Sequence, residues 1–400
     1  MVNKMSKKRK FIAFTVISTL TGIIIYGHSS IHLVEPFFSV LLSHPEAPIE
    51  RLHGKQYDPL RATRVYAPVA LDAKKRIYIA GSKGGKTQVL VLNRQGEIER
   101  IFTPRLKGGR FSRWCALFSV SPSGNRIWTV EWEKVGIHRI TVHDRYGKPE
   151  AEWLISGYAT VELLINAYSE YGAYLFASDV ACFRFEIGKK EPQEFKIPEN
   201  FRPLYPIFFR DGRYWGMSEL DWLIQRIGAS EFKKQMAKSE TQKDSYGIVT
   251  WSPQEGLQLV SAIGFPRRMN IQWIDEKGNF YDYLWGHHFI HLPSFLTKIP
   301  VLVRILKAFG IYEGAVKPIP PKILIFSPKG KLLDVVPLFA VIRPKEGKKL
   351  EYGQLVKVDE TGIYLEVERV SEPREYRIVK IVKKPRWKVW WEKLTKRTER

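Results

Sequence analysis

The sequence predicts an all-β fold, a β-propeller of about six four-stranded blades, with an N-terminal transmembrane helix and two short helical insertions. Two observations predict the propeller. Short β-type runs joined by turn residues recur in groups of four, and the turns that open these groups recur at a blade-sized interval. A third observation, an uncharged run behind an N-terminal basic cluster, predicts the transmembrane helix.

The N-terminus has the pattern of an uncleaved signal anchor. The cluster Lys7–Lys10 precedes residues 11–27, which carry no charge. That run is just long enough for a transmembrane helix, which needs about 17–25 residues. No small-residue cleavage pattern follows, and the next basic residue is Arg51. Residues 1–27 are therefore predicted to be a cytoplasmic basic tail and a single membrane span, with the body on the extracytoplasmic side.

Residues 28–64 are predicted to connect the anchor to the body. The run Ile31–Leu42 is apolar enough to lie on the membrane surface. Pro45, Pro48 and Pro59 follow it and are expected to stiffen the chain.

Residues 65–382 are predicted to form the propeller. The first unit contains four β-type runs joined by turns: Ala67–Asp72, Arg76–Ala80, Val89–Leu92 and Glu97–Phe102. Opening turns recur at about residues 72, 121, 169, 210, 275 and 359. Their spacing is roughly 40–50 residues where no insertion intervenes, as in propeller blades. A single unit cannot bury both of its faces, so the ring is expected to close.

Two opening turns are nearly identical. They read Ile274-Asp-Glu-Lys-Gly278 and Val358-Asp-Glu-Thr-Gly362. At these residues the chain resembles the six-bladed propellers of the NHL and TolB-like superfamily, whose blades share an opening of the form x-Asp-x-x-Gly followed by apolar residues. The resemblance implies the fold over about residues 65–382. It implies little about function, because one fold hosts many activities.

Two long intervals between turns indicate helical insertions. In about 218–243, Ser218 is a candidate cap, and Leu220, Leu223, Ile224 and Ile227 follow at helical spacing. In about 291–320, the run Pro300–Phe309 is more hydrophobic than a solvated surface helix. It is expected to pack over the rim of its own domain, with a partner or a membrane as the alternative.

The formal net charge is +23, and much of it lies at the chain ends. Residues 1–10 contain five basic residues and no acidic one, and residues 383–400 contain eight basic and two acidic residues. Basic ends around a moderately basic body favour membrane electrostatics over the reading of nucleic-acid bases. No nucleic-acid partner is expected.

Cys115 and Cys182 are the two cysteines of the chain. Two cysteines cannot form a zinc site alone, and each lies among apolar residues, which favours ordinary buried thiols. The sequence leaves open whether they form one disulfide.

The run Ala80–Thr87 satisfies a relaxed form of the phosphate-binding loop, with Lys86 and Thr87 in place. That mechanism needs a helix directly after Thr87. Gln88–Leu92 instead has the composition of a strand and runs into a turn at Asn93. The run is predicted to be a hairpin loop, and no nucleotide is expected.

Candidate metal ligands are confined to the run Gly286–His291. His287 and His291 fall on one side of either a strand or a helix, as zinc-ligating histidines do. Trp285 and Phe289 beside them indicate a packed surface, so structural histidines are favoured over a divalent-metal site.

The C-terminal tail, residues 383–400, has the pattern of an interfacial amphipathic helix. Trp387, Trp390, Trp391 and Leu394 fall at i, i+3, i+4 and i+7, with lysine and arginine on the remaining arc. These four residues are the predicted membrane-interface site. The alternative is that the tryptophans dock onto the propeller.

The leading prediction is a membrane-anchored extracytoplasmic propeller that acts as a non-enzymatic binding or scaffold module. Its basic character favours an anionic partner: phospholipid head groups, an acidic envelope polymer or an acidic protein surface. The competing hypothesis is a metal-dependent propeller enzyme of lactonase, hydrolase or lyase type. That enzyme would need a divalent metal held by ligands from several blades, and the sequence assigns no catalytic residue to it.

Overall fold

The computed structural model describes most of the predicted propeller. It covers residues 30–42, 44–52, 69–110, 115–134, 136–156, 163–177, 181–198, 201–210, 212–218, 230, 234, 244–265, 271–289, 316–342, 350–369, 373–385, 388–389 and 391. The predicted transmembrane helix and most of both predicted insertions lie outside these residues. Within the ranges that are described, no helix is both long and apolar enough to cross a membrane.

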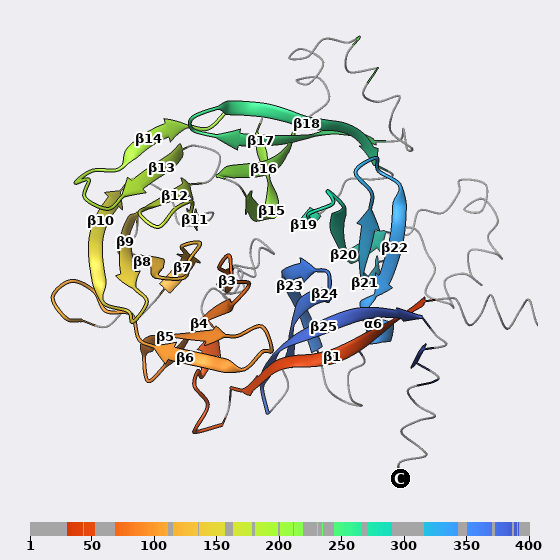
Figure 1. The fold of residues 1–400 in the computed structure, drawn as a ribbon, viewed down its shortest axis with the longest axis horizontal. Coiled ribbons are helices and arrows are strands. Elements are labelled where there is room, and N and C mark those ends of the chain that lie inside the picture. The colour runs from red at the N-terminus through yellow and green to blue at the C-terminus, as the bar shows by residue number, and fades with distance from the viewer. Residues whose placement is uncertain are drawn as a thin grey trace, which may run out of the picture.

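Six antiparallel sheets are arranged in a ring, so the predicted six-bladed propeller is confirmed (Figure 1). Blade 1 contains β3 (Val69–Leu71), β4 (Ile77–Lys83), β5 (Lys86–Leu92) and β6 (Ile98–Phe102), with β2 (Arg51–Leu52) also paired to β4. Blade 2 contains β7 (Cys115–Val120), β8 (Arg126–Lys134), β9 (Ile137–Asp144) and β10 (Pro149–Ser156). Blade 3 contains β11 (Leu163–Ala167), β12 (Gly172–Ala177), β13 (Ala181–Glu186) and β14 (Gln193–Lys196).

The second half of the ring is built in the same way, except at its last strand. Blade 4 contains β15 (Arg202–Arg210), β16 (Arg213–Ser218), β17 (Asp244–Ser252) and β18 (Gly256–Phe265). Blade 5 contains β19 (Ile271–Ile274), β20 (Phe280–Phe289), β21 (Val316–Phe326) and β22 (Leu332–Pro337), and the short helix α6 (Leu338–Val341) follows it. Blade 6 contains β23 (Leu350–Asp359), β24 (Gly362–Arg369), β25 (Glu375–Pro385) and β1 (Ser30–Leu41).

The strand β1 closes the ring, which differs from the connector expected over residues 28–64. It is the outer strand of blade 6 and pairs with β25 from Ser30 opposite Pro385 to Leu41 opposite Glu375. Three strands of blade 6 come from the end of the chain, so its outer edge would be open without a strand from the start. The apolar run that suggested contact with a membrane surface therefore packs within the propeller.

The second predicted insertion also ends earlier than expected. Residues 316–320 belong to β21, whose pairing with β20 reaches from Phe326 to Val316. The ladder continues past the prolines at positions 318, 320 and 321, with Pro318 opposite His287. A bulge between Leu284 and Gly286 interrupts the register there, as expected where proline removes a donor.

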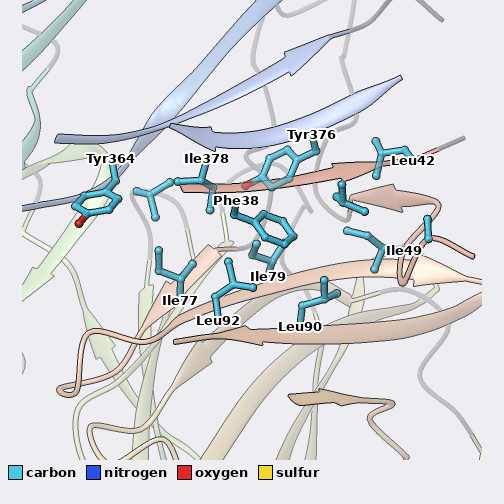
Figure 2. Close-up of a cluster of buried hydrophobic side chains, with 13 residues drawn as sticks. Phe38, Leu42, Ile49, Ile77, Ile79, Leu90, Leu92, Tyr364, Tyr376 and Ile378 are labelled. Carbon is cyan, nitrogen blue, oxygen red and sulfur yellow. The ribbon is translucent and has the colours of Figure 1, made fainter. Parts of the chain in front are cut away.

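Hydrophobic cores fill the spaces between neighbouring sheets. Figure 2 shows the core between blades 6 and 1, where Phe38 from β1 meets Ile77 and Ile79 from β4 and Tyr376 from β25. Tyr78 points to the other side of β4, into the core shared with blade 2. Both faces of each sheet are therefore buried, which explains why the strands are continuously apolar rather than alternating.

At one end of the propeller, hydrogen bonds and one ion pair link the inner turns of several neighbouring blades. Each inner turn joins the first and second strands of its blade, and several contact the turn of the next blade. The linked pairs are Arg76 with Ser123, Ser123 with Glu170, Arg210 with Asp275, and Lys75 with Glu360. These contacts fix neighbouring blades relative to one another.

The aspartate of the opening motif has a structural role. Asp275 accepts hydrogen bonds from the backbone N–H groups of Lys277 and Asn279, each at 2.9 Å, and from the Tyr281 hydroxyl at 3.2 Å. A carboxylate at this position therefore caps the turn and ties it to the following strand.

Candidate functional site

The two ends of the described chain meet at one corner of the ring. In blades 1 to 5 a turn joins the third strand to the fourth, but in blade 6 the third strand is β25 and the fourth is β1 (Figure 1). Ser30 pairs with Pro385, so these two residues occupy the place of that turn. We call this place, with the adjoining part of β22, the exit corner.

Asp334 of β22 holds the exit corner together. Its Oδ2 atom accepts from His32 Nε2 at 3.1 Å and from Lys383 Nζ at 2.8 Å, so one carboxylate binds both β1 and β25. Partial burial tends to raise the pKa of Asp334. The bonds from Lys383, the backbone N–H of Val335 and His32 outweigh it, and the net pKa lies below its ordinary value. Asp334 therefore stabilises the junction between blades 5 and 6 in its ionised form.

Replacing Asp334 with asparagine is expected to loosen this junction. The change removes the negative charge that faces Lys383, at a cost of about 1 kcal/mol, because the pair is partly exposed. Amide hydrogen exchange should become faster in β1 and the end of β25 and stay unchanged in blade 3. Glu255→Gln is a matched control, since Glu255 pairs with Arg213 inside blade 4. Equal effects of both variants on β1 would contradict the assignment.

The predicted membrane-interface residues follow Pro385 of this corner in the sequence. Trp391 is 59% exposed, and Lys388 near it is exposed as well. Trp387, Trp390 and Leu394 lie outside the described residues, so their shared face remains a prediction. The structure shows where the tail starts, because Pro385 lies opposite Ser30.

The structure does not test the candidate metal ligands, because their side chains lie outside the described ones. His287 lies in β20, opposite Pro318 of β21, and its side chain is not among the described ones. His291 lies outside the described residues. Among the side chains that are described, no three histidine, cysteine, aspartate or glutamate residues are placed to hold a metal ion.

The phosphate-loop-like run forms the predicted hairpin. Ile77–Lys83 is β4, Lys86–Leu92 is β5, and the turn between them contains Gly84 and Gly85. Thr87 is fully buried within the sheet, and Lys86 is exposed. The strand that follows leaves no helix N-terminus to bind a phosphate at this loop.

Cys182 is a free, fully buried thiol in β13. Burial raises its pKa well above the ordinary value, with partial compensation by a hydrogen bond involving Tyr214. The prediction of an ordinary buried thiol is confirmed for Cys182. The side chain of Cys115 is outside the described set.

A buried polar pair between blades 1 and 2 was not found from the sequence. His143 of β9 and Thr129 of β8 are both fully buried, and His143 Nε2 lies 2.9 Å from the Thr129 hydroxyl. Burial lowers the pKa of His143 from 6.5 to about 4, although backbone groups of Gly147 and Arg105 and the charge of Asp144 oppose the shift. The imidazole is therefore neutral in the folded protein at neutral pH.

This histidine is expected to destabilise the fold in acid. The unfolded chain takes up a proton near pH 6.5 and the folded protein only near pH 4, so stability falls as the pH decreases through that window. The loss should approach about 3 kcal/mol at the lower end. Urea unfolding of the chain from residue 28, measured between pH 7 and 4, would show it. His143→Gln should reduce the slope of the free energy of unfolding against pH by the equivalent of one bound proton. An unchanged slope would contradict the assignment.

A shallow groove on the rim between blades 1 and 2 has basic walls. Arg105 and Lys148 are both among its lining residues, so the groove would favour an anion over a cation. Its lining residues are Gln88, Ile101, Phe102, Thr103, Arg105, Tyr146 and Lys148.

Comparison with known proteins gives structural likeness without close kinship. No family model matches the chain, and no curated protein matches it. Similar solved structures include BamB from Moraxella catarrhalis, 9% identical over 88% of this chain and 98% of that one, with a TM-score of 0.37. The β-propeller domain of Cps50 (Swd1) from Myceliophteria thermophila is 10% identical over 78% of this chain and 95% of that one, with a TM-score of 0.36. The β-propeller domain of the Trilobed protease from Pyrococcus furiosus is 12% identical over 77% of this chain and 83% of that one, with a TM-score of 0.36. The assignment of six blades therefore rests on the sheet order described above.

Proposed function

We propose that this protein is a single-pass, membrane-anchored propeller on the extracytoplasmic side that acts as a binding or scaffold module for an anionic or protein partner. The proposal includes membership of the NHL and TolB-like superfamily, which its turn motif supports. The observation that carries the proposal is the pairing of Ser30 with Pro385. It brings Ser30 and Pro385 to one corner, so a membrane span formed by residues 11–27 and the tryptophan-rich tail would both start from that corner.

The closed ring suits a scaffold. Attachment at one corner leaves the other blades and the far end of the ring accessible to a partner. The linked inner turns and the Asp334 contacts hold the blades in fixed positions. A rigid surface limits the conformational entropy lost when a partner binds.

Membrane attachment is tested on the full-length protein in the cells that express it. The protein should sediment with membranes and resist alkaline carbonate extraction, whereas the chain from residue 28 should be released. Protease added to intact cells should cleave exposed turns of the propeller. Cleavage seen only after cell lysis would overturn the proposed topology.

The binding role is tested by photo-crosslinking from the end of the ring opposite the exit corner. A photoreactive residue at Lys86, beside the β4–β5 turn, or at Glu133, beside the β8–β9 turn, lies at that end, and both positions are exposed. A discrete crosslinked protein or polymer is expected at one or both positions in intact cells. Its absence at both would overturn the scaffold role, and a metal-dependent enzyme would be tested next.

A further inference from the structure

At the exit corner, only a very short stretch of chain connects the propeller to the segment before it. Positions 28 and 29 alone separate the uncharged run 11–27 from Ser30. An extended chain covers at most about 3.6 Å per residue, so Ser30 lies within about 11 Å of the last residue of that run. If residues 11–27 span a bilayer, the exit corner lies at the level of the lipid head groups.

Apolar residues are concentrated beside this corner. On β22, Leu332 and Leu333 are each 48% exposed and Val335 is 36% exposed. Leu333 and Val335 flank Asp334, the residue that binds both β1 and β25. Among the described outer strands, β6 exposes two large apolar residues, Ile98 and Ile101, and β1, β10 and β18 expose one each, Leu41, Leu154 and Val260. The β22 group is therefore more than the scattered exposure usual on protein surfaces.

Basic residues border the same apolar group. Lys329 and Lys331 lie in the turn before β22, and Lys383 lies beside Asp334. All three are exposed. Apolar side chains bordered by lysine suit the interface of an anionic bilayer, where the apolar groups enter the acyl boundary and the ammonium groups meet phosphate. They suit an acidic polymer in water less well, since the leucines would gain nothing from it.

We infer that Leu332, Leu333 and Val335, with Lys329, Lys331 and Lys383, form a second membrane contact of this protein, which rests blade 5 on an anionic phospholipid surface. The inference depends on the proposed anchor for its geometry. It adds that the propeller is held in a fixed tilt against the bilayer, with the tail from Pro385 at the same level. Blades 2 and 3, across the ring, then face away from the membrane (Figure 1).

The contact is tested by the depth of a nitroxide label at Leu333→Cys in the full-length protein. The protein carries Cys115→Ser, retains the buried Cys182, and is placed in vesicles of phosphatidylcholine with phosphatidylglycerol. Collisions with oxygen should exceed those with a water-soluble nickel complex at Leu333, and the reverse should hold for Leu154→Cys on β10, which is 58% exposed. Val335→Cys is a second site should the Leu333 variant fold poorly.

The lysines are tested in the same system. Replacing Lys329 and Lys331 with glutamine should move the Leu333 label toward water in vesicles that contain phosphatidylglycerol and leave it unchanged in phosphatidylcholine alone. The control replaces Lys189 and Lys190, exposed in the equivalent turn of blade 3. An equal shift from both pairs would overturn the role of the corner lysines.

Each other result has a defined meaning. Protein that floats with the vesicles but leaves Leu333 as accessible to nickel as Leu154 overturns the blade 5 contact and leaves the anchor standing. A Leu333 label shielded from both oxygen and nickel overturns it in favour of coverage by the tail or by a second copy. Protein that fails to float overturns the anchor and this contact together.

Discussion

A chain that begins at residue 45 is expected to lack a closed propeller. Removing β1 leaves blade 6 with three strands and exposes the outer edge of β25. It also removes Phe38, Val40 and Leu42 from the core between blades 6 and 1, where Tyr376 and Ile378 are fully buried. Each buried apolar side chain contributes about 1.5–3 kcal/mol, and a whole strand ladder is lost with them. The total is comparable with the entire stability of a typical domain, about 5–15 kcal/mol.

The matched control for this truncation is the chain that begins at residue 28. It loses the predicted anchor and keeps all of β1. It should give one cooperative thermal transition and a structured near-ultraviolet circular dichroism spectrum, whereas the chain from residue 45 should give a broad transition or aggregate. Similar melting of the two chains would show that β1 is dispensable and that the ring closes by other contacts.

The sequence predicts what is local in this fold. The opening turns were found because an aspartate such as Asp275 must lie two and four residues before the N–H groups that it caps, and this spacing is visible in the chain. The hairpin at Lys83–Lys86 was found for the same reason, since a glycine pair between two apolar runs is a local signal for a β-hairpin turn.

Closure of the ring is a property of distant residues. β1 does not form a hairpin with a strand close to it in the sequence. It is a strand because it pairs with β25, with Ser30 opposite Pro385. Its apolar residues therefore suggested a membrane surface as readily as a blade core. The exit corner was missed for the same reason, because His32 and Asp334 are 302 positions apart.

Buried polar groups are equally hidden from a single sequence. Nothing in the composition of β8 and β9 separates Thr129 and His143 from solvent-facing residues, because both sheet faces are covered only once neighbouring blades are in place. The protonation state of His143 is set by that packing.

The Gly96→Ala variant is expected to strain the contact between blade 1 and β1, the strand that closes the ring. Gly96 lies in the turn between β5 and β6 with φ +88°, and a Cβ atom there would overlap the carbonyl oxygen of Phe37 in β1. A left-handed conformation costs a residue with a side chain about 1–2 kcal/mol, and forcing atoms into a packed site typically adds about 1–3 kcal/mol. We therefore expect the free energy of unfolding to fall by about 2–5 kcal/mol.

Gly188→Ala separates the two contributions. Gly188 lies in the equivalent turn of blade 3, between β13 and β14, with φ +92° and no atom within 4 Å of a Cβ built there. It should therefore lose only the conformational part, about 1–2 kcal/mol. Urea unfolding of both variants, in the chain from residue 28, gives the difference between their losses in free energy of unfolding. That difference measures the cost of moving Phe37 of β1 away from the Gly96 turn. Hydrogen exchange should place that cost in β1, and equal losses for the two glycines would show that β1 yields at this contact without strain.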